Sequence, residues 1–104
     1  MDVSELKNIS DRSYRIAVAK KDALEKARSS SLLAYSGHLF QADATLINLI
    51  HILKQSHKEF VVLDSNDNPM MVDNPTEFLE KLIAKNQEAL NLYHQLYNDT
   101  VIKG

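Results

Sequence analysis

The segment from Tyr35 to Leu53 constrains the fold most strongly, because a tight turn runs into an apolar helix with no spacer between them. Ser36-Gly37 predicts a reversal in which glycine takes a positive φ, between the short extended arms Ala34-Tyr35 and His38-Leu39-Phe40. Asp43 stands at the expected N-cap of the helix. Apolar residues then cover most faces of that helix, which predicts a position at the centre of the core: Leu46, Ile47, Leu49, Ile50, Ile52 and Leu53.

The N-terminal part of the chain has the spacing of one long helix. From Val3 to Arg28, apolar or small side chains recur at helical intervals, and charged residues fill the other faces. The recurring residues are Leu6, Ile9, Ile16, Ala19, Ala23 and Ala27. Because this stripe is narrow and rich in alanine, we expect the helix either to pack closely on another element or to project as an arm. Ser29-Ser30-Ser31 is expected to end it.

A second hairpin and a long final helix are expected in the C-terminal half. The apolar runs Phe60-Val61-Val62-Leu63 and Met70-Met71-Val72 flank a cluster of turn-forming residues, Ser65-Asn66-Asp67-Asn68-Pro69. Asn74-Pro75-Thr76-Glu77 then predicts a helix start, with Asn74 as N-cap, Pro75 at the first helical position and Glu77 bonding back to the N–H of the cap. The helix is expected to continue almost to Gly104, since no proline or glycine intervenes.

Together these elements predict a single domain over residues 1–104 that belongs to the α+β class and is mainly helical. The order is helix, short β-hairpin, apolar helix, second β-hairpin and long C-terminal helix. Residues 1–28 form the N-terminal helix that can project as an arm, and residues 32–104 form the compact core.

The last helix also fits a heptad pattern, with Leu79, Leu82, Asn86, Ala89, Tyr93, Leu96 and Thr100 alternating three and four residues apart. One interpretation is a seam between chains, in which a buried Asn86 sets register and oligomeric state. The other is an amphipathic helix packed on its own domain, with Asn86 at the solvent edge. If the helix contacts a partner, we expect Asn86, Tyr93, Leu96 and Tyr97 to make the contact, because tyrosine combines apolar area with a hydrogen-bonding tip.

Composition argues against several functional classes. The formal net charge is −2 and basic residues are mixed with acidic ones, which disfavours nucleic-acid binding. There is no cysteine, which excludes disulfides, thiolate metal sites and cysteine nucleophiles. The N-terminus has no apolar segment of a secretory signal, and the apolar stretch from Leu46 to Leu53 is too short to span a bilayer. We expect a cytoplasmic protein that binds neither nucleic acid nor membrane.

Motifs for chemistry are weak. A metal site would need His51 and His57 brought together with a carboxylate of Asp64 or Glu59, and His51 is better explained as a core or interface histidine. The acidic turn at residues 64–68 lacks the glycine and terminal glutamate of a calcium loop, so a hairpin turn is favoured. With only Gly37 and Gly104 in the chain, a glycine-rich phosphate loop is excluded. We predict no catalytic residues, no metal and no cofactor.

The order of features from Val18 to Ile102 resembles a phage-encoded domain family of unknown function found in tail-fibre and tail-associated proteins. The resemblance rests on an alanine- and charge-rich helix that leads into a motif of spaced residues, Tyr35, Gly37, His38, Phe40 and Asp43. A helix, a strand ending in Asp67-Asn68, an apolar strand and a capped last helix follow. This resemblance implies a structural or assembly role in a tail.

We therefore expect a non-enzymatic tail-associated protein, as a tail-fibre or baseplate component or an assembly chaperone. It would bind a tail protein of the same phage, or itself as a dimer or trimer, in the host cytoplasm during assembly or in the virion tail. The alternative from another class is a small host-directed regulatory protein or inhibitor. A third hypothesis is a metal-dependent enzyme using His51, His57 and Asp64.

Overall fold

The computed structural model describes residues 3–102 and contains three helices, two β-hairpins and a terminal π-helix. In chain order they are α1 (Val3–Ser30), β1 (Leu32–Tyr35), β2 (His38–Gln41), α2 (Ala44–Ser56), β3 (Phe60–Leu63), β4 (Pro69–Val72), α3 (Pro75–Tyr97) and the π-helix η1 (Asn98–Ile102). The predicted α+β class and element order are confirmed. The predicted domain also includes residues 1–2 and 103–104, which lie outside the described residues.

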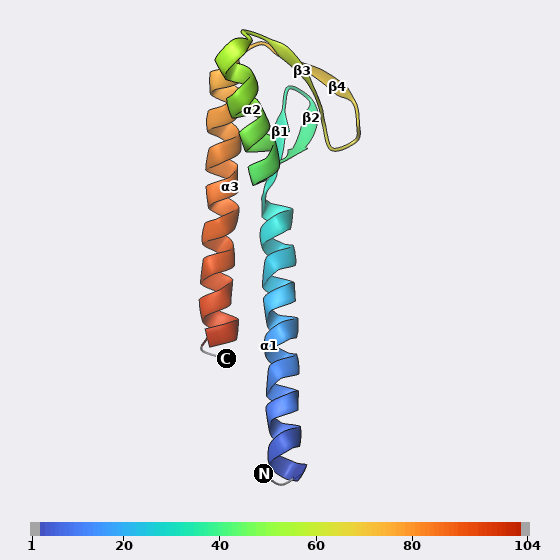
Figure 1. Ribbon diagram of the computed structural model, residues 1–104, viewed down its shortest axis with the longest axis vertical. Helices are drawn as coiled ribbons and strands as arrows, with labels where there is room; N and C mark the ends of the chain where they lie inside the picture. Colours follow the sequence, from blue (N-terminus) through green and yellow to red (C-terminus); the bar gives the residue numbers. More distant parts are fainter. Residues whose placement is uncertain (1–2, 103–104) are drawn as a thin grey trace.

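The molecule is elongated, with extents of 65 × 24 × 23 Å. Figure 1 shows α1 and α3 running antiparallel, with the N-terminal end of α1 extending past the C-terminal end of α3. The first half of α3 packs beside α2 and the hairpins, and its second half packs beside α1. We call residues 31–82 the head, because both hairpins and α2 lie there, above the C-terminal end of α1.

The hydrophobic core lies in the head. Its largest fully buried side chains come from β2, α2, β4 and the first half of α3, and are Phe40, Ile50, Val72, Phe78 and Leu82. The Phe78 ring lies 4.8 Å from the Tyr35 ring and 4.9 Å from the Phe40 ring, in tilted and edge-to-face contacts that aromatic side chains prefer. Burial raises the pKa of Tyr35, with smaller contributions from the Glu77 and Asp73 carboxylates. The core thus depends on side chains brought together by both hairpins.

Each hairpin forms its own two-stranded antiparallel sheet. In the first, Tyr35 pairs with His38 across the turn, and both turn residues have positive φ, 51° at Ser36 and 78° at Gly37. Positive φ at both central positions characterises the type I′ turn, which matches the twist of the flanking strands. In the second hairpin, burial alternates along both strands, so that Phe60, Val62, Met70 and Val72 point into the core.

Local capping explains where the helices begin. The Asp43 carboxylate accepts a hydrogen bond from the Leu46 N–H at 2.9 Å, and the Asn74 side chain accepts one from the Glu77 N–H at 3.3 Å. Pro75 occupies the first helical position, as predicted. The Glu77 carboxylate accepts from the side-chain amide of Asn74 at 3.1 Å rather than from the backbone N–H predicted for it.

The N-terminal helix ends two residues later than predicted. Ser29 and Ser30 remain helical, because their hydroxyls donate to the carbonyls of Glu25 and Ala27, within the preceding turn. Ser31 is the first residue beyond the helix, and it is buried. Its N–H donates to the Arg28 carbonyl, which closes the last turn.

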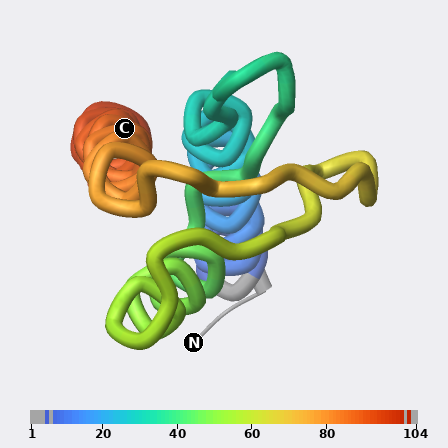
Figure 2. Tube along the Cα trace, turned by 90° about the horizontal axis from the view of Figure 1, so that it is seen from above, coloured from blue at the N-terminus to red at the C-terminus, as the bar shows by residue number. Residues whose placement is uncertain are grey.

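The prediction that α2 lies at the centre of the core is wrong. Ile50 is its only buried residue, whereas Leu49 is 44% exposed and Ile52 is 62% exposed. Figure 2 shows why: α2 lies at the edge of the head, to one side of the plane that contains α1 and α3. Its apolar residues therefore exceed what its own chain covers.

Candidate protein-binding surfaces

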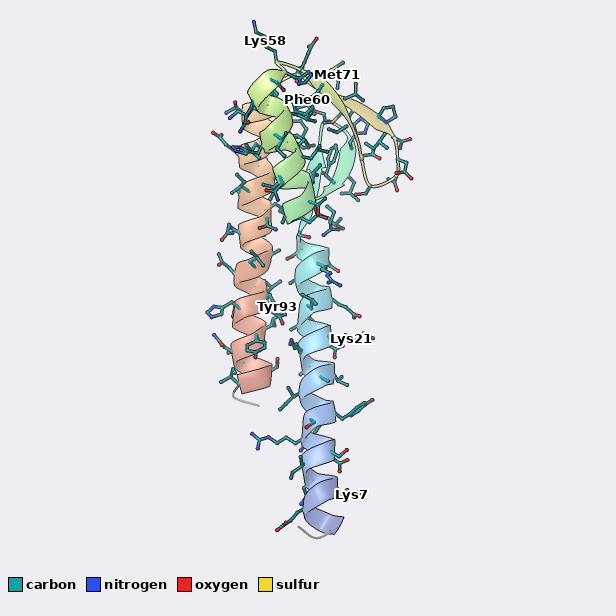
Figure 3. All side chains as sticks on the ribbon, in the orientation of Figure 1. Lys7, Lys21, Lys58, Phe60, Met71 and Tyr93 are labelled. Atoms are coloured by element: carbon teal, nitrogen blue, oxygen red, sulfur yellow. The ribbon has the colours of Figure 1, made fainter. Side chains whose placement is uncertain are left out.

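An open groove runs between α1 and α3 just below the start of α2. It has a volume of about 410 Å³, and its walls are mainly apolar: Leu24 and Ala27 from α1, and Ala89, Leu90 and Tyr93 from α3. Figure 3 shows Tyr93 on α3, on the side toward α1. We call this feature the α1–α3 groove.

Three polar side chains at the upper end of the groove have partners within the chain, and Arg28 lines the groove beside them. Asn86 donates through Nδ2 to the Ala42 carbonyl at 3.0 Å, and Gln41 donates to the Arg28 carbonyl at 3.0 Å and to the Ser31 hydroxyl. Asp43 is occupied as the N-cap of α2. The groove therefore offers apolar area more than hydrogen-bonding groups to an occupant.

The four residues predicted to contact a partner all lie on α3, and all are half-buried. Tyr93 lines the groove, and its ring lies 5.9 Å from that of Tyr97. Leu96 lines a smaller cavity with Ala19 and Ala23 of α1. Asn86 packs on its own domain through Ala42. At least part of the heptad stripe therefore contacts α1 of the same chain, and a contact with another chain stays a prediction.

Beyond this contact, α1 continues past the end of the other described elements. Ala19 lies opposite Thr100 and η1 ends at Ile102, so residues 3–15 project past the end of α3 (Figure 1). We call residues 3–15 the arm; Lys7 marks it in Figure 3. Ile9 on the arm is 53% exposed, and Ile16 just after it is 38% exposed. The side chain of Leu6 lies outside the described part of the structure.

The second hairpin has an apolar surface on both sides. Opposite its core-facing residues, an outer face is formed by Val61, Leu63, Pro69 and Met71, in which Val61 pairs with Met71 and Leu63 with Pro69. Val61 is 54%, Leu63 59% and Met71 53% exposed. A hairpin with one face in water normally carries polar residues on that face. We call this surface the outer hairpin face.

This outer face was not identified from the sequence, although a signal was present. The strands lack the alternation of apolar and polar residues that a half-buried hairpin shows, since Phe60 to Leu63 and Met70 to Val72 are apolar throughout. Uninterrupted apolar runs of this kind are typical of strands covered on both sides.

The two hairpins are joined by a hydrogen bond between a histidine and a buried aspartate, which local sequence patterns did not predict. His38 Nδ1 donates to Asp64 Oδ2 at 2.7 Å, and the Asp64 side chain is only 3% exposed. The Asp64 carboxylate also accepts from the N–H groups of Asn66 and Asn68, while the Ser65 N–H donates to the Leu39 carbonyl. The hydrogen bond from His38 and those from the backbone hold the pKa of Asp64 below its ordinary value.

The other candidate sites are not assembled. Among the described residues, no group of three or more His, Asp or Glu side chains is placed to hold a metal ion. His51 is exposed, and its Nε2 lies 3.3 Å from Nε2 of Gln55. Of the two predicted positions, the core is therefore wrong and an interface stays a prediction. The acidic turn is a hairpin turn, in which Asp67 has a φ of 61° and Asp64 binds the backbone.

The motif residues that carry the resemblance have structural roles. Tyr35 and Phe40 pack on Phe78, Gly37 shapes the turn, His38 binds Asp64, and Asp43 caps α2. Searches of family models, of curated proteins and of solved structures find no match to this chain. Within residues 3–102, no helix combines the length and apolar character needed to cross a membrane.

Proposed function

We propose that this protein is a tail-associated structural or assembly protein of a phage, which binds a tail protein of the same phage through the outer hairpin face. The resemblance of the Tyr35-to-Asp43 motif to tail-associated domains supports the tail as its context. The observation that carries the binding role is the exposed apolar surface of Val61, Leu63 and Met71.

Burial of this surface would supply useful binding energy. Each of the three side chains is about half exposed, so covering it is worth about 1 kcal/mol by apolar area. Because β3 and β4 are paired only with each other, a partner strand can also bind an edge of this sheet through its backbone. Both contributions favour a protein ligand.

The first test is quantitative mass spectrometry of purified particles of the encoding phage. A fixed ratio of this chain to known tail proteins supports a tail component. The chain can also be abundant in infected cells and absent from particles. That result favours an assembly chaperone if the purified chain binds a tail protein. It favours the host-directed inhibitor if the purified chain binds a host enzyme instead.

The surface is tested by Val61→Lys, with Asn66→Lys as the matched control in the turn of the same hairpin. We expect Val61→Lys to lose binding to the tail protein by at least about tenfold, since it places a charge in an apolar contact. Asn66→Lys should bind as the unmodified chain does. Equal binding by both variants would contradict the assignment of this face.

A further inference from the structure

We propose that two copies of this chain associate antiparallel across the α1–α3 groove, so that the arm of each copy lies along α2 of the other. This inference rests on the proposed function, in which the outer hairpin face binds the tail protein. The helical surfaces are then left for self-association. Four observations carry it.

The first observation is the small size of the side chains that α1 buries. The buried residues that α1 contributes are Ala23 and Ala27, and an alanine buries little apolar area. Beside this contact the groove stays open, with Leu90 50% exposed on its wall. Two helices become a stable bundle when further helices cover the flank of the pair.

The second observation is a match of lengths. On the groove side of the α1–α3 pair, α2 covers the upper part and begins at Ala44, directly above the groove (Figures 1 and 2). The α1–α3 pair of a second copy fits below α2 when the head of that copy points in the opposite direction to the head of the first. The arm and α2, which has 13 residues, are each about 20 Å long at 1.5 Å per residue.

The arm and α2 also carry complementary apolar positions. Ile9 of the arm and Ile52 and Leu49 of α2 are 53%, 62% and 44% exposed. When the arm of one copy runs antiparallel to α2 of the other, with residue 15 near the start of α2, Ile9 comes level with the middle of α2. Both exposed surfaces are then covered by the same contact.

The third observation is charge, which favours the antiparallel arrangement. α1 carries seven Lys or Arg and four Asp or Glu, a net charge of +3. The head carries seven Asp or Glu and three Lys, a net charge of −4 with neutral histidines. The part of α1 that meets the head of the other copy in the antiparallel pair is the arm, which has a net charge of +1 from three basic and two acidic residues. This contact sets a basic segment against the acidic head, whereas a parallel pair sets the two acidic heads together.

The fourth observation is the available area. A packed helix contributes a strip about 10 Å wide. The arm, α2 and the groove-facing halves of α1 and α3 together provide about 80 Å of helix, hence on the order of 800 Å² per chain. This equals the area that each partner contributes to a typical stable interface.

Sedimentation equilibrium of the full chain tests the stoichiometry. We expect a monomer–dimer equilibrium, with Leu90→Lys raising the dissociation constant at least about tenfold because it buries a charge in the groove. Asn91→Lys is the matched control on the neighbouring exposed position of α3 and should dimerise normally. A monomer at all concentrations, a trimer, or equal dimerisation by both variants would overturn the inference.

Engineered disulfides test the geometry, and the absence of cysteine from the natural chain makes the result unambiguous. We expect Ile9→Cys/Ile52→Cys to form covalent dimers on oxidation, since a disulfide requires Cα atoms within about 4–7 Å. Within one chain, Ile9 lies on the arm and Ile52 lies on α2, and α2 is beyond the opposite end of α1 (Figure 1). Covalent dimers of Ile9→Cys alone would indicate a parallel pair and refute the arrangement, as would no cross-linking of the double variant.

Failure of this inference can be told apart from failure of the proposed function. Val61→Lys should remain dimeric while losing the tail protein. If Leu90→Lys and the unmodified chain are both monomeric and both bind the tail protein, only the dimer is refuted.

Discussion

Asn86 provides the sharpest test of how α3 is held against the rest of the chain. Its Nδ2 donates to the carbonyl of Ala42, a residue with no exposed surface, at 3.0 Å. Replacing Asn86 by alanine removes the donor and leaves this carbonyl without its side-chain partner. An orphaned buried acceptor costs about 1–3 kcal/mol of folding free energy.

This loss is large relative to the total, because a chain of this size is stable by about 5–15 kcal/mol. It corresponds to a fall in melting temperature of about 5–15 °C. Asn91→Ala is the matched control, since it makes the same substitution at an exposed site of the same helix and gains the same helix propensity. Urea unfolding followed by circular dichroism at one fixed protein concentration measures both variants, because self-association makes stability depend on concentration.

Asn86→Leu distinguishes the two interpretations of the heptad pattern. A polar residue in a seam between chains reduces stability, so leucine at a seam would stabilise the assembly. The bond to Ala42 predicts the opposite, a loss of stability in Asn86→Leu. A stabilised Asn86→Leu, or an Asn86→Ala indistinguishable from Asn91→Ala, would refute the reasoning.

Three further predictions concern the head. The lowered pKa of Asp64 stabilises the folded state at any pH above the ordinary aspartate pKa. Asp64→Asn should therefore be less stable than the unmodified chain at pH 7, and this deficit should shrink as the pH falls below about 4. A pH-independent deficit in urea unfolding would contradict the role of the His38–Asp64 pair. Asp43→Ala should lose about 1 kcal/mol and helical signal through loss of the α2 cap, and unchanged thermal unfolding would count against it. Ser36→Asn should gain a few tenths of a kcal/mol, since asparagine tolerates the positive φ of the turn better; a lower melting temperature would show that the turn has other requirements.

The order of elements was predictable because the first hairpin turn and the starts of α2 and α3 have local chemical causes. Ser36-Gly37 favours a type I′ turn, Asp43 caps α2, and Asn74-Pro75 starts α3. These signals act between residues that are close in sequence. They specify where a helix begins without specifying what it packs against.

Features that depend on distant residues were not predictable. The His38–Asp64 pair joins residues 26 apart, and the Asn86–Ala42 bond joins residues 44 apart. The edge position of α2 depends on which of its apolar faces α3 and the hairpins cover, and periodicity alone does not indicate that. Of the candidate surface, the α3 residues were proposed from the heptad, but the groove exists only because α1 lies beside them.

The position of the core also bears on the order of events during synthesis. Every residue of the main core cluster lies between Phe40 and Leu82, whereas the part of α3 that receives α1 follows Leu82. The N-terminal helix therefore leaves the ribosome before the head but acquires its partner only after the head is complete. Throughout that interval α1 lacks the tertiary packing that supplies most of the stability of a helix. The head can close on its own contacts before α1 docks, so within this chain a segment that is translated early is secured late.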